Sequence, residues 1–157
     1  LTDAFAALTA QWPQLHRFAT RFAGLPVRNS GTLGGNVANG SPIGDSMPLL
    51  IALRAQVVLA SQARGERQLP LEDLYTGYRQ NVMAPDELLA RIVVPRPGVT
   101  EVLRAYKISK RFDDDISAVG LDINLDIEAD VVRRASIGAG ARITIRLNSF
   151  SYSLAGG

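Results

Sequence analysis

Residues 28–45 of this 157-residue chain read RNSGTLGGNVANGSPIGD, and five of these eighteen residues are glycine. Glycine packs no side chain and costs backbone entropy on folding, so a run this rich in it usually lets the backbone approach another group closely. Successive exposed N–H groups in such a run form a concave site for anions such as phosphate. An ordinary long loop of turn residues accounts for the same composition, and spacing alone leaves the two interpretations equal.

Asp45 closes this run at the head of an apolar stretch, residues 47–53. An aspartate in that place is typical of a helix N-cap, so we expect a helix over roughly Ser46–Leu53. The same carboxylate is suited to accept hydrogen bonds from the hydroxyls of a sugar. Asp45 is therefore a candidate both for a helix cap and for a ligand contact.

Composition limits the kinds of protein this chain can be. Hydrophobic residues make up 46% of it, which is enough for a packed core and argues against disorder. It contains no cysteine, which excludes disulfides, thiolate-bound zinc and a cysteine-ligated iron–sulfur cluster within the chain and is compatible with the cytoplasm. The net charge is +2, the basic residues are dispersed among acidic ones, and no apolar run reaches the ~18 residues of a membrane span. We therefore expect neither a nucleic-acid nor a membrane partner, and a cytoplasmic location.

Hydrophobic periodicity predicts an α+β fold, with helices first and strands later. The proline- and glycine-rich segment at residues 95–98 is the best candidate for an internal boundary. Before it we expect two short helices within residues 2–23, a hairpin of residues 56–61 and 67–69, a helical turn over 70–75 and a strand over 88–94. Beyond it we expect long strands over residues 103–109, 116–128, 131–137 and 142–147.

The segment Gly120–Glu128 alternates strictly between apolar and polar residues. Leu121, Ile123, Leu125 and Ile127 share one face of the expected strand, and Asp122, Asn124, Asp126 and Glu128 share the other. This pattern predicts a sheet with one face in the core and the polar face in water, which is typical of antiparallel sheets.

Few side chains in the chain are suited to catalysis. His16 is the only histidine and lies on an apolar-periodic helix, so we interpret it as a boundary residue and not as a general base. The run Asp113–Asp115 is more typical of a solvated turn than of a metal site, because neighbours in a strand point to opposite faces. Lys107 is interpreted as a surface cation or as a positive charge for a phosphate or a reduced ring, and Phe22 as a core residue or a stacking platform.

Two segments of the glycine-rich run, Thr32–Asn36 (TLGGN) and Ser41–Asp45 (SPIGD), together resemble the second flavin-binding segment of the molybdenum hydroxylases. This family includes the flavoproteins of xanthine dehydrogenase and carbon monoxide dehydrogenase. Three further segments resemble family landmarks in the same order, and the resemblance covers about residues 1–138: Leu71–Arg79, Pro85–Leu89 and Tyr106–Ser117. The lysine followed by paired acids and Ile-Ser is most similar to the xanthine dehydrogenase branch, particularly its bacterial small subunit with FAD and iron–sulfur clusters.

The resemblance implies a fold and a function for the chain. Residues 1–97 are expected to be the carboxyl-terminal part of an FAD-binding domain of the vanillyl-alcohol-oxidase/MurB type, and residues 98–157 a truncated carboxyl-terminal flavoprotein subdomain with an antiparallel sheet. In such enzymes electrons pass from a molybdenum cofactor through two 2Fe-2S clusters to FAD, which reduces NAD. The large molybdenum subunit and the iron–sulfur domain are therefore expected partners. Alternatives are a carbon monoxide or aldehyde dehydrogenase flavoprotein, or a non-catalytic nucleotide-binding or assembly module.

The resemblance also implies which residues hold FAD, while the hydride chemistry itself belongs to the cofactor. No catalytic residue and no metal ligand is expected in this chain. The expected FAD contacts are Phe22 against the flavin region; Thr32, Gly35 and Asn36 around the pyrophosphate; Asp45 at the ribose or adenosine end; Leu89 and Lys107 near the isoalloxazine; and Asp114 and Asp115 near the ring, where a movable charge tunes its potential.

The chain departs from the family pattern in two places. Family members carry an earlier glycine-rich flavin segment and iron–sulfur domains upstream, and after Gly138 they continue with a small-residue turn, a proline and a long helix. Here the sequence opens with Leu1, and residues 139–157 follow a different, serine-rich pattern. We therefore expect a piece of a longer polypeptide that retains FAD weakly, is inactive alone and leaves its last sheet partly uncovered.

Overall fold

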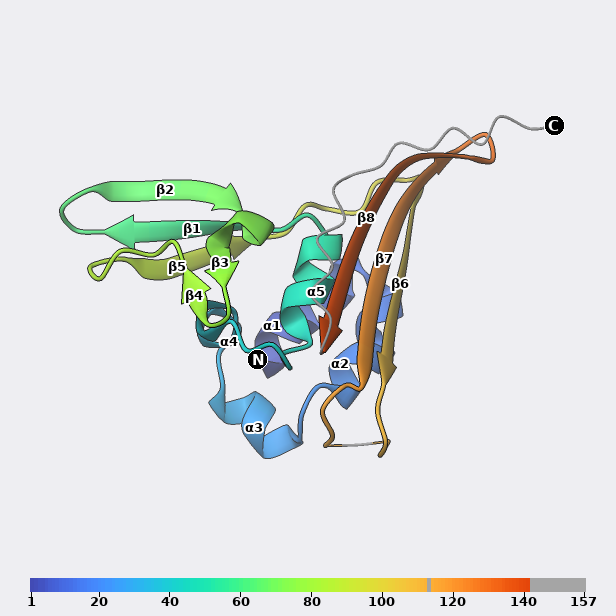
Figure 1. The fold of residues 1–157 in the computed structure, drawn as a ribbon. Coiled ribbons are helices and arrows are strands. Elements are labelled where there is room, and N and C mark those ends of the chain that lie inside the picture. Colours follow the sequence, from blue (N-terminus) through green and yellow to red (C-terminus); the bar gives the residue numbers. More distant parts are fainter. Residues whose placement is uncertain (113, 142–157) are drawn as a thin grey trace.

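Two antiparallel three-stranded sheets stand on either side of a group of short helices in the computed structural model (Figure 1). The structure describes residues 1–112 and 114–141. The helical elements are α1 (Thr2–Gln11), η1 (Pro13–Leu15), α2 (His16–Arg21), α3 (Leu25–Ser30), α4 (Leu33–Asn39), α5 (Ser46–Ala52) and η2 (Leu71–Leu74). The strands are β1 (Gln56–Ser61), β2 (Gly65–Pro70), β3 (Tyr75–Gly77), β4 (Gln80–Asn81), β5 (Leu88–Val93), β6 (Glu101–Ile108), β7 (Val119–Glu128) and β8 (Val131–Ala141). The expected α+β fold is confirmed.

The first sheet has the order β2-β1-β5, with all pairs antiparallel. Its hairpin and its third strand confirm the expectations for residues 56–69 and 88–94. The turn is tighter than expected, because Gly65 adopts a φ of +74° and lets β2 begin there. Val57 and Leu59 of β1 are fully buried and pack with Leu71 and Leu74 of the predicted helical turn.

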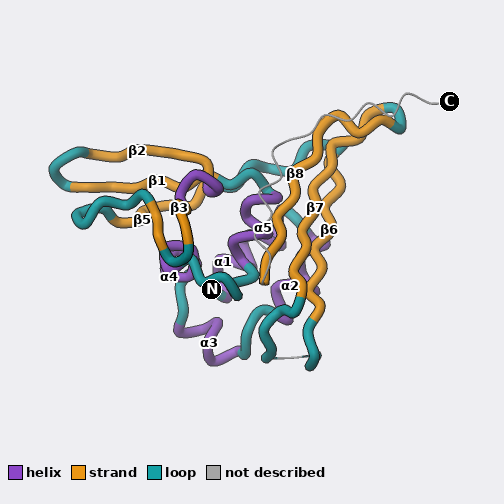
Figure 2. The backbone as a smooth tube through the Cα atoms, in the orientation of Figure 1, coloured by secondary structure: helices purple, strands orange, loops and turns teal. Residues whose placement is uncertain are grey.

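The second sheet has the order β6-β7-β8 and is also antiparallel, as expected. An extended loop after β5 leads to it, and this loop contains the proline- and glycine-rich segment 95–98 (Figure 2). One rung of the sheet aligns Lys107 with Gly120 and Gly140. The strand expected over residues 142–147 lies outside the described residues.

The prediction that the polar face of β7 meets water is wrong. Asp122 and Asn124 are 1% and 3% exposed, while Leu121 and Ile123 on the opposite face are only half-buried. The polar face packs against α5, as the contacts of that helix with β7 and β8 show. Glycines on the inner face allow this close approach, since a Cβ at Gly138 would lie 1.9 Å from the Pro48 carbonyl oxygen.

The glycine-rich run is largely helical, so its interpretation as an ordinary long loop is wrong. Its centre forms α4, because Thr32 caps the helix: the Thr32 Oγ1 accepts a hydrogen bond from the Gly35 amide at 3.0 Å. Gly40 ends the helix in the left-handed conformation with a φ of +56°. Local capping thus overcomes the low helix propensity of the glycine pair.

Short helices make the layer between the sheets and share two hydrophobic cores. The two helices expected within residues 2–23 are confirmed, and three phenylalanines of this segment pack together: Phe5, Phe18 and Phe22. Helix α5 belongs to both cores, because Leu49 and Leu53 pack with these phenylalanines while Leu50 packs with Val57 and its neighbours. No helix within the described ranges is both long enough and apolar enough to cross a lipid bilayer.

Candidate functional site

A buried ion pair joins the amino end of α5 to the second sheet. Asp45 occupies the N-cap position, as expected, but its side chain makes no capping hydrogen bond. Instead, Lys107 Nζ donates to Asp45 Oδ2 and Ser117 Oγ donates to Asp45 Oδ1, both at 2.5 Å. The side chains of Lys107 and Asp45 are only 5% and 10% exposed. The interpretation of Lys107 as a surface cation is therefore wrong, and a charge pair withdrawn from water at a cost in solvation is a candidate functional group.

Asp122 lies on the same inner face of the sheet as Lys107 and is almost completely buried. Burial, with a smaller contribution from the negative charge of Asp45, raises the pKa of Asp122 to about 8. Its Oδ1 atom has no hydrogen-bond partner among the described residues. The sequence pattern missed Asp122 because strict alternation placed it on the face expected to meet water.

The amino end of α4 brings three expected FAD residues close to α5. The Asn36 amide donates to the Thr32 carbonyl oxygen at 3.1 Å, and the Gly35 amide donates to Thr32 Oγ1. Both amides are therefore already hydrogen-bonded at the start of α4. The amides of Leu33 and Gly34 have no acceptor within residues 1–112 and 114–141, as first-turn amides of a helix have none within it. Ser46 Oγ donates to Asn36 Oδ1 and ties α4 to the start of α5.

Leu89 on β5 lies against the glycine pair of α4: a Cβ at Gly34 would be 3.7 Å from Leu89 Cδ2. The turn before β5 is held by a two-pronged ion pair, in which Arg67 Nε and Nη2 donate to the Glu87 carboxylate at 2.7 and 2.8 Å. The Arg67 guanidinium, together with the Ala84 amide, lowers the pKa of Glu87 to about 2. Glu87, two positions before Leu89, is therefore held by this ion pair.

Arg21 holds the aspartate-bearing loop after β6. Its guanidinium donates to the Lys107 carbonyl oxygen at 2.9 Å, to Ser109 Oγ at 3.1 Å and to the Phe112 carbonyl oxygen at 3.1 Å, and it lies 4.8 Å from the centre of the Phe112 ring. Sequence reasoning missed Arg21, since an arginine at the end of a short helix carries no distinctive signal.

The aspartates of this loop separate into two environments. The Asp114 carboxylate lies beside Gly24, where an added Cβ would be 3.1 Å from its oxygens. Asp115 accepts a hydrogen bond from the Arg111 amide at 2.8 Å, and this bond lowers the pKa of Asp115. Asp113 lies outside the described residues. Within those residues, no group of three or more histidine, cysteine or acidic side chains is arranged to hold a metal ion.

Phe22 lies apart from the other expected FAD residues. Its ring is 5.0 Å from that of Phe5 and is 6% exposed, so its side chain belongs to the core. Its link to the loop is indirect, through the neighbouring Gly24 that contacts Asp114. The structure thus brings together Asp45 and Lys107 directly, connects Asn36 to them through Ser46, and keeps the Phe22 ring separate.

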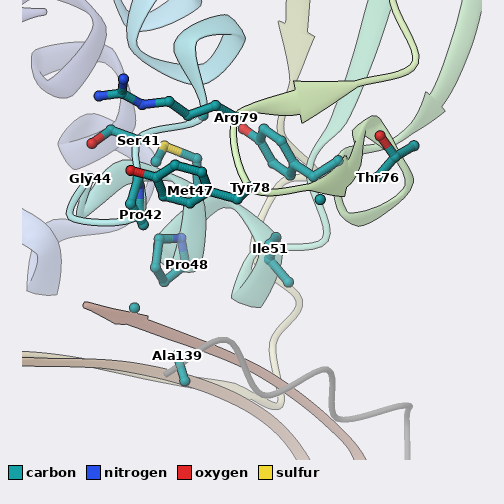
Figure 3. Close-up of a pocket in the computed structure, with 14 residues that line it drawn as sticks. Ser41, Pro42, Gly44, Met47, Pro48, Ile51, Thr76, Tyr78, Arg79 and Ala139 are labelled. Atoms are coloured by element: carbon teal, nitrogen blue, oxygen red, sulfur yellow. The ribbon is translucent and has the colours of Figure 1, made fainter. Parts of the chain in front are cut away.

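A cavity of about 400 Å³ lies beside the loop that joins α4 to α5 (Figure 3). It is bounded by the loop Gly40–Gly44, by α5, by the segment Tyr75–Arg79 and by Gly140 near the end of β8. Figure 3 shows the Tyr78 side chain reaching from the β3–β4 turn toward Met47 and Pro48 of α5. Residues 32–36 do not line this cavity. Sequence reasoning noted the segment LYTGYR only as a family landmark and did not assign it a place at the site.

Tyr75 fixes one wall of this cavity. Its hydroxyl donates to the Val37 carbonyl oxygen at 2.8 Å, and burial raises the pKa of Tyr75. Its ring also packs on Gly40, where an added Cβ would lie 2.9 Å from Tyr75 Cε1.

The Gly40→Ala variant is expected to lose about 1–2 kcal/mol of unfolding free energy, because alanine is strained at a positive φ and its Cβ would push on Tyr75. Urea denaturation measures the loss. Gly65→Ala is the matched control: its φ is +74° but nothing lies within 4 Å of the added Cβ, so it reports the backbone strain alone. Equal losses in the two variants would contradict a tight Tyr75 wall.

Comparison with known proteins identifies relatives. A family model described as the FAD binding domain in molybdopterin dehydrogenase matches residues 1–97. The xanthine dehydrogenase of Blastobotrys adeninivorans is 38% identical over 110 residues, which are 69% of this chain and 8% of that protein. The xanthine dehydrogenase/oxidase of Mus musculus is 37% identical over 125 residues, 76% of this chain and 9% of that protein. The chain therefore spans less than a tenth of the length of either relative.

Solved structures give the same assignment at the level of the fold. The Cu,Mo-CO dehydrogenase in its cyanide-inactivated form contains a chain with a TM-score of 0.76 and 28% identity, over 85% of this chain and 46% of that one. Quinoline 2-oxidoreductase from Pseudomonas putida 86 contains another, with a TM-score of 0.72 and 26% identity, over 88% of this chain and 47% of that one.

Proposed function

The chain belongs to the family of FAD-binding domains in molybdopterin dehydrogenases, and we propose that it is the electron-transfer portion of a xanthine dehydrogenase-like enzyme, in which FAD delivers electrons to NAD. The observation that carries the proposal is the family match over residues 1–97 together with 37–38% identity to two xanthine dehydrogenases. The proposal includes a division at residues 95–98 into an FAD-binding part, 1–97, and a flavoprotein subdomain, 98–157.

The residues at the amino ends of α4 and α5 fit an FAD molecule. The amides of Leu33 and Gly34, which have no acceptor among the described residues, are suited to one phosphate of the diphosphate. Lys107 and Asp45 offer a cation and a hydrogen-bond acceptor that are already desolvated and held in place. FAD supplies the redox chemistry when it is bound. The chain's own task is to hold the cofactor and to set the charge around it.

We assign a place to each of the nine expected residues. Thr32, Gly35 and Asn36 shape and support the end of α4 that meets the diphosphate, while Leu89 and Lys107 lie toward the ring. Asp45 is the acceptor between these regions. Asp114 and Asp115 are on the loop that Arg21 holds, where a shift of the loop would change the charge near the flavin. Phe22 acts from the core as a support for that loop.

The partners proposed are an iron–sulfur domain and a subunit with the molybdenum cofactor, in a cytoplasmic enzyme of purine catabolism. The extent of the relatives supports this, because the matched region is 8–9% of xanthine dehydrogenases that are much longer proteins. The second candidate is a flavoprotein subunit of a carbon monoxide dehydrogenase, which the TM-score of 0.76 favours. Assay of the assembled enzyme with xanthine and with carbon monoxide, and with NAD as acceptor, distinguishes the two.

The Lys107→Met variant is expected to bind FAD about tenfold or more weakly than the wild-type chain, a change of ~1.4 kcal/mol, because it removes the buried cation. Quenching of flavin fluorescence during titration of the purified chain measures the affinity. Lys110→Met is the matched control, since Lys110 is exposed and follows the same strand.

Two further measurements distinguish the loss of the Lys107 cation from a loss of folding. The double variant Asp45→Asn/Lys107→Gln removes both charges and avoids leaving one of them buried alone, and circular dichroism checks that each variant folds. Wild-type affinity in Lys107→Met would contradict the assignment of Lys107. Absence of FAD binding in every variant would contradict the proposed function, and tight stoichiometric binding would contradict the expected weak retention.

A further inference from the structure

Asp122 is a buried carboxyl group for which the proposed FAD contacts give no role. It is 1% exposed, it lies in the middle of β7 opposite Ala105 and Gly138, and its Oδ1 atom has no partner among the described residues. An unpaired buried carboxyl group costs folding free energy, and carboxyl groups with shifted pKa values cluster at functional sites.

Asp122 and Lys107 are diagonal neighbours on the inner face of the sheet, since Ala105 is opposite Asp122 and Lys107 is two residues further along β6. Diagonal neighbours in adjacent strands lie within reach of a long side chain. Lys107 thus has two aspartates as neighbours, Asp45 at the amino end of α5 and Asp122 on the adjacent strand β7. The structure shows it bound to Asp45.

The other elements packed around Asp122 contribute almost no charge. Helix α5, residues Ser46–Ala52, contains no titratable side chain. On the inner face of β8, Ser136, Gly138 and Gly140 are uncharged, and Arg134, further along the strand, is paired with Glu101 and Asp126. From α2 comes Arg21, whose three donor atoms are all engaged with the loop after β6 and the end of that strand. Among the described residues, the charge around Asp122 is therefore set by Asp45 and Lys107 together with Asp122 itself.

We propose that Asp122 is a positioning residue for the Asp45–Lys107 pair: as a neutral acid it leaves Lys107 on Asp45, and when it releases its proton to solvent it competes for the ammonium group and weakens FAD binding. This rests on the proposed function, in which Lys107 lies beside FAD. With Asp122 protonated the three groups sum to zero charge. With Asp122 ionised they sum to −1, next to a cofactor whose diphosphate is itself negative, so both the position of Lys107 and the local charge become less favourable.

The first test follows FAD affinity with pH. The dissociation constant of the wild-type chain, measured by flavin fluorescence quenching, is expected to rise about tenfold between pH 6.5 and 9.5, the effect of one buried charge. Asp122→Asn, which keeps the shape of the neutral acid, is expected to keep the low-pH affinity throughout. Asp130→Asn is the matched control, because Asp130 is exposed at the β7–β8 turn, and it should follow the wild type. The same pH dependence in Asp122→Asn and the wild type would overturn the proposal.

The second test needs no FAD. Carbon-13 NMR of the aspartate carboxyl groups is expected to give a titration midpoint near pH 8 for Asp122, and a lower midpoint in Asp45→Asn, where repulsion is removed and Lys107 is released. A midpoint near 4, or no change in Asp45→Asn, would refute the coupling of Asp122 to the pair whatever FAD does. If no variant binds FAD while the NMR midpoints are as expected, the proposed function has failed, and the role of Asp122 in FAD binding fails with it.

Discussion

Replacing Asp122 by asparagine is expected to stabilise the protein at pH 7 by up to about 4 kcal/mol, the cost of keeping a proton on a carboxyl group that the unfolded chain would release. Asp122 ionises at its ordinary pKa of 3.8 when the chain is unfolded, and at about 8 when it is folded. Between these values the folded state binds one proton more than the unfolded state. Wild-type stability therefore falls as pH rises from about 4 to about 8, and this slope should be absent in Asp122→Asn.

Urea unfolding followed by circular dichroism at pH 5, 7 and 9 measures this prediction. The advantage of Asp122→Asn should be small at pH 5 and largest at pH 9, and the exposed Asp130→Asn should match the wild type at each pH. An advantage that does not grow with pH would mean that Asp122 ionises normally. A loss of stability at every pH would mean that the carboxyl group has partners that the amide cannot replace.

The Gly138→Ala variant is expected to lose about 3 kcal/mol or more of unfolding free energy, because a single methyl group cannot fit between β8 and α5. The added Cβ would lie 1.9 Å from the Pro48 carbonyl oxygen and 2.7 Å from its Cα, and both are backbone atoms that cannot rotate away. Helix α5 would have to move off the sheet, which would also disturb the Asp45–Lys107 pair at its amino end.

Gly120→Ala is the control for this variant, since Gly120 lies on the same inner face but its added Cβ would meet nothing closer than 3.7 Å. We expect little change there, or a small gain from the lower entropy of the unfolded chain. Thermal and urea unfolding measure both variants. A loss of less than ~1 kcal/mol in Gly138→Ala would mean that α5 does not contact the sheet as closely as described.

Most strands were predictable because their signals are local. The hairpin around Gly65 and the alternation of β7 depend on neighbouring residues, and the antiparallel pairing of the second sheet followed from them. The orientation of β7 was not predictable, because it depends on what packs on each face. Helix α5 lies far away in the sequence, and its contact with Gly138 selects the small and polar face for burial.

The site was predictable by resemblance and only in part from the residues. Asp45 was expected at the start of a helix, but nothing local indicates that its carboxylate binds Lys107, which is 62 residues away. The composition of the glycine-rich run is also that of an ordinary loop, whereas the Thr32 cap makes its centre a helix and leaves only the first amides without intrahelical partners. Arg21 and Asp122 act through contacts between distant elements, so no pattern in their own segments points to them.

Helix α5 contributes side chains to both hydrophobic cores, and this contribution couples the unfolding of the two cores. Leu49 and Leu53 enter one core and Leu50 enters the other, so neither core can be exposed without loosening the same two turns of helix. The two sheets should therefore behave as one cooperative unit, even though the strands of one do not pair with those of the other. Amide hydrogen exchange in β1 and in β7 should accordingly report the same opening free energy, which a chain of two independent halves would not show.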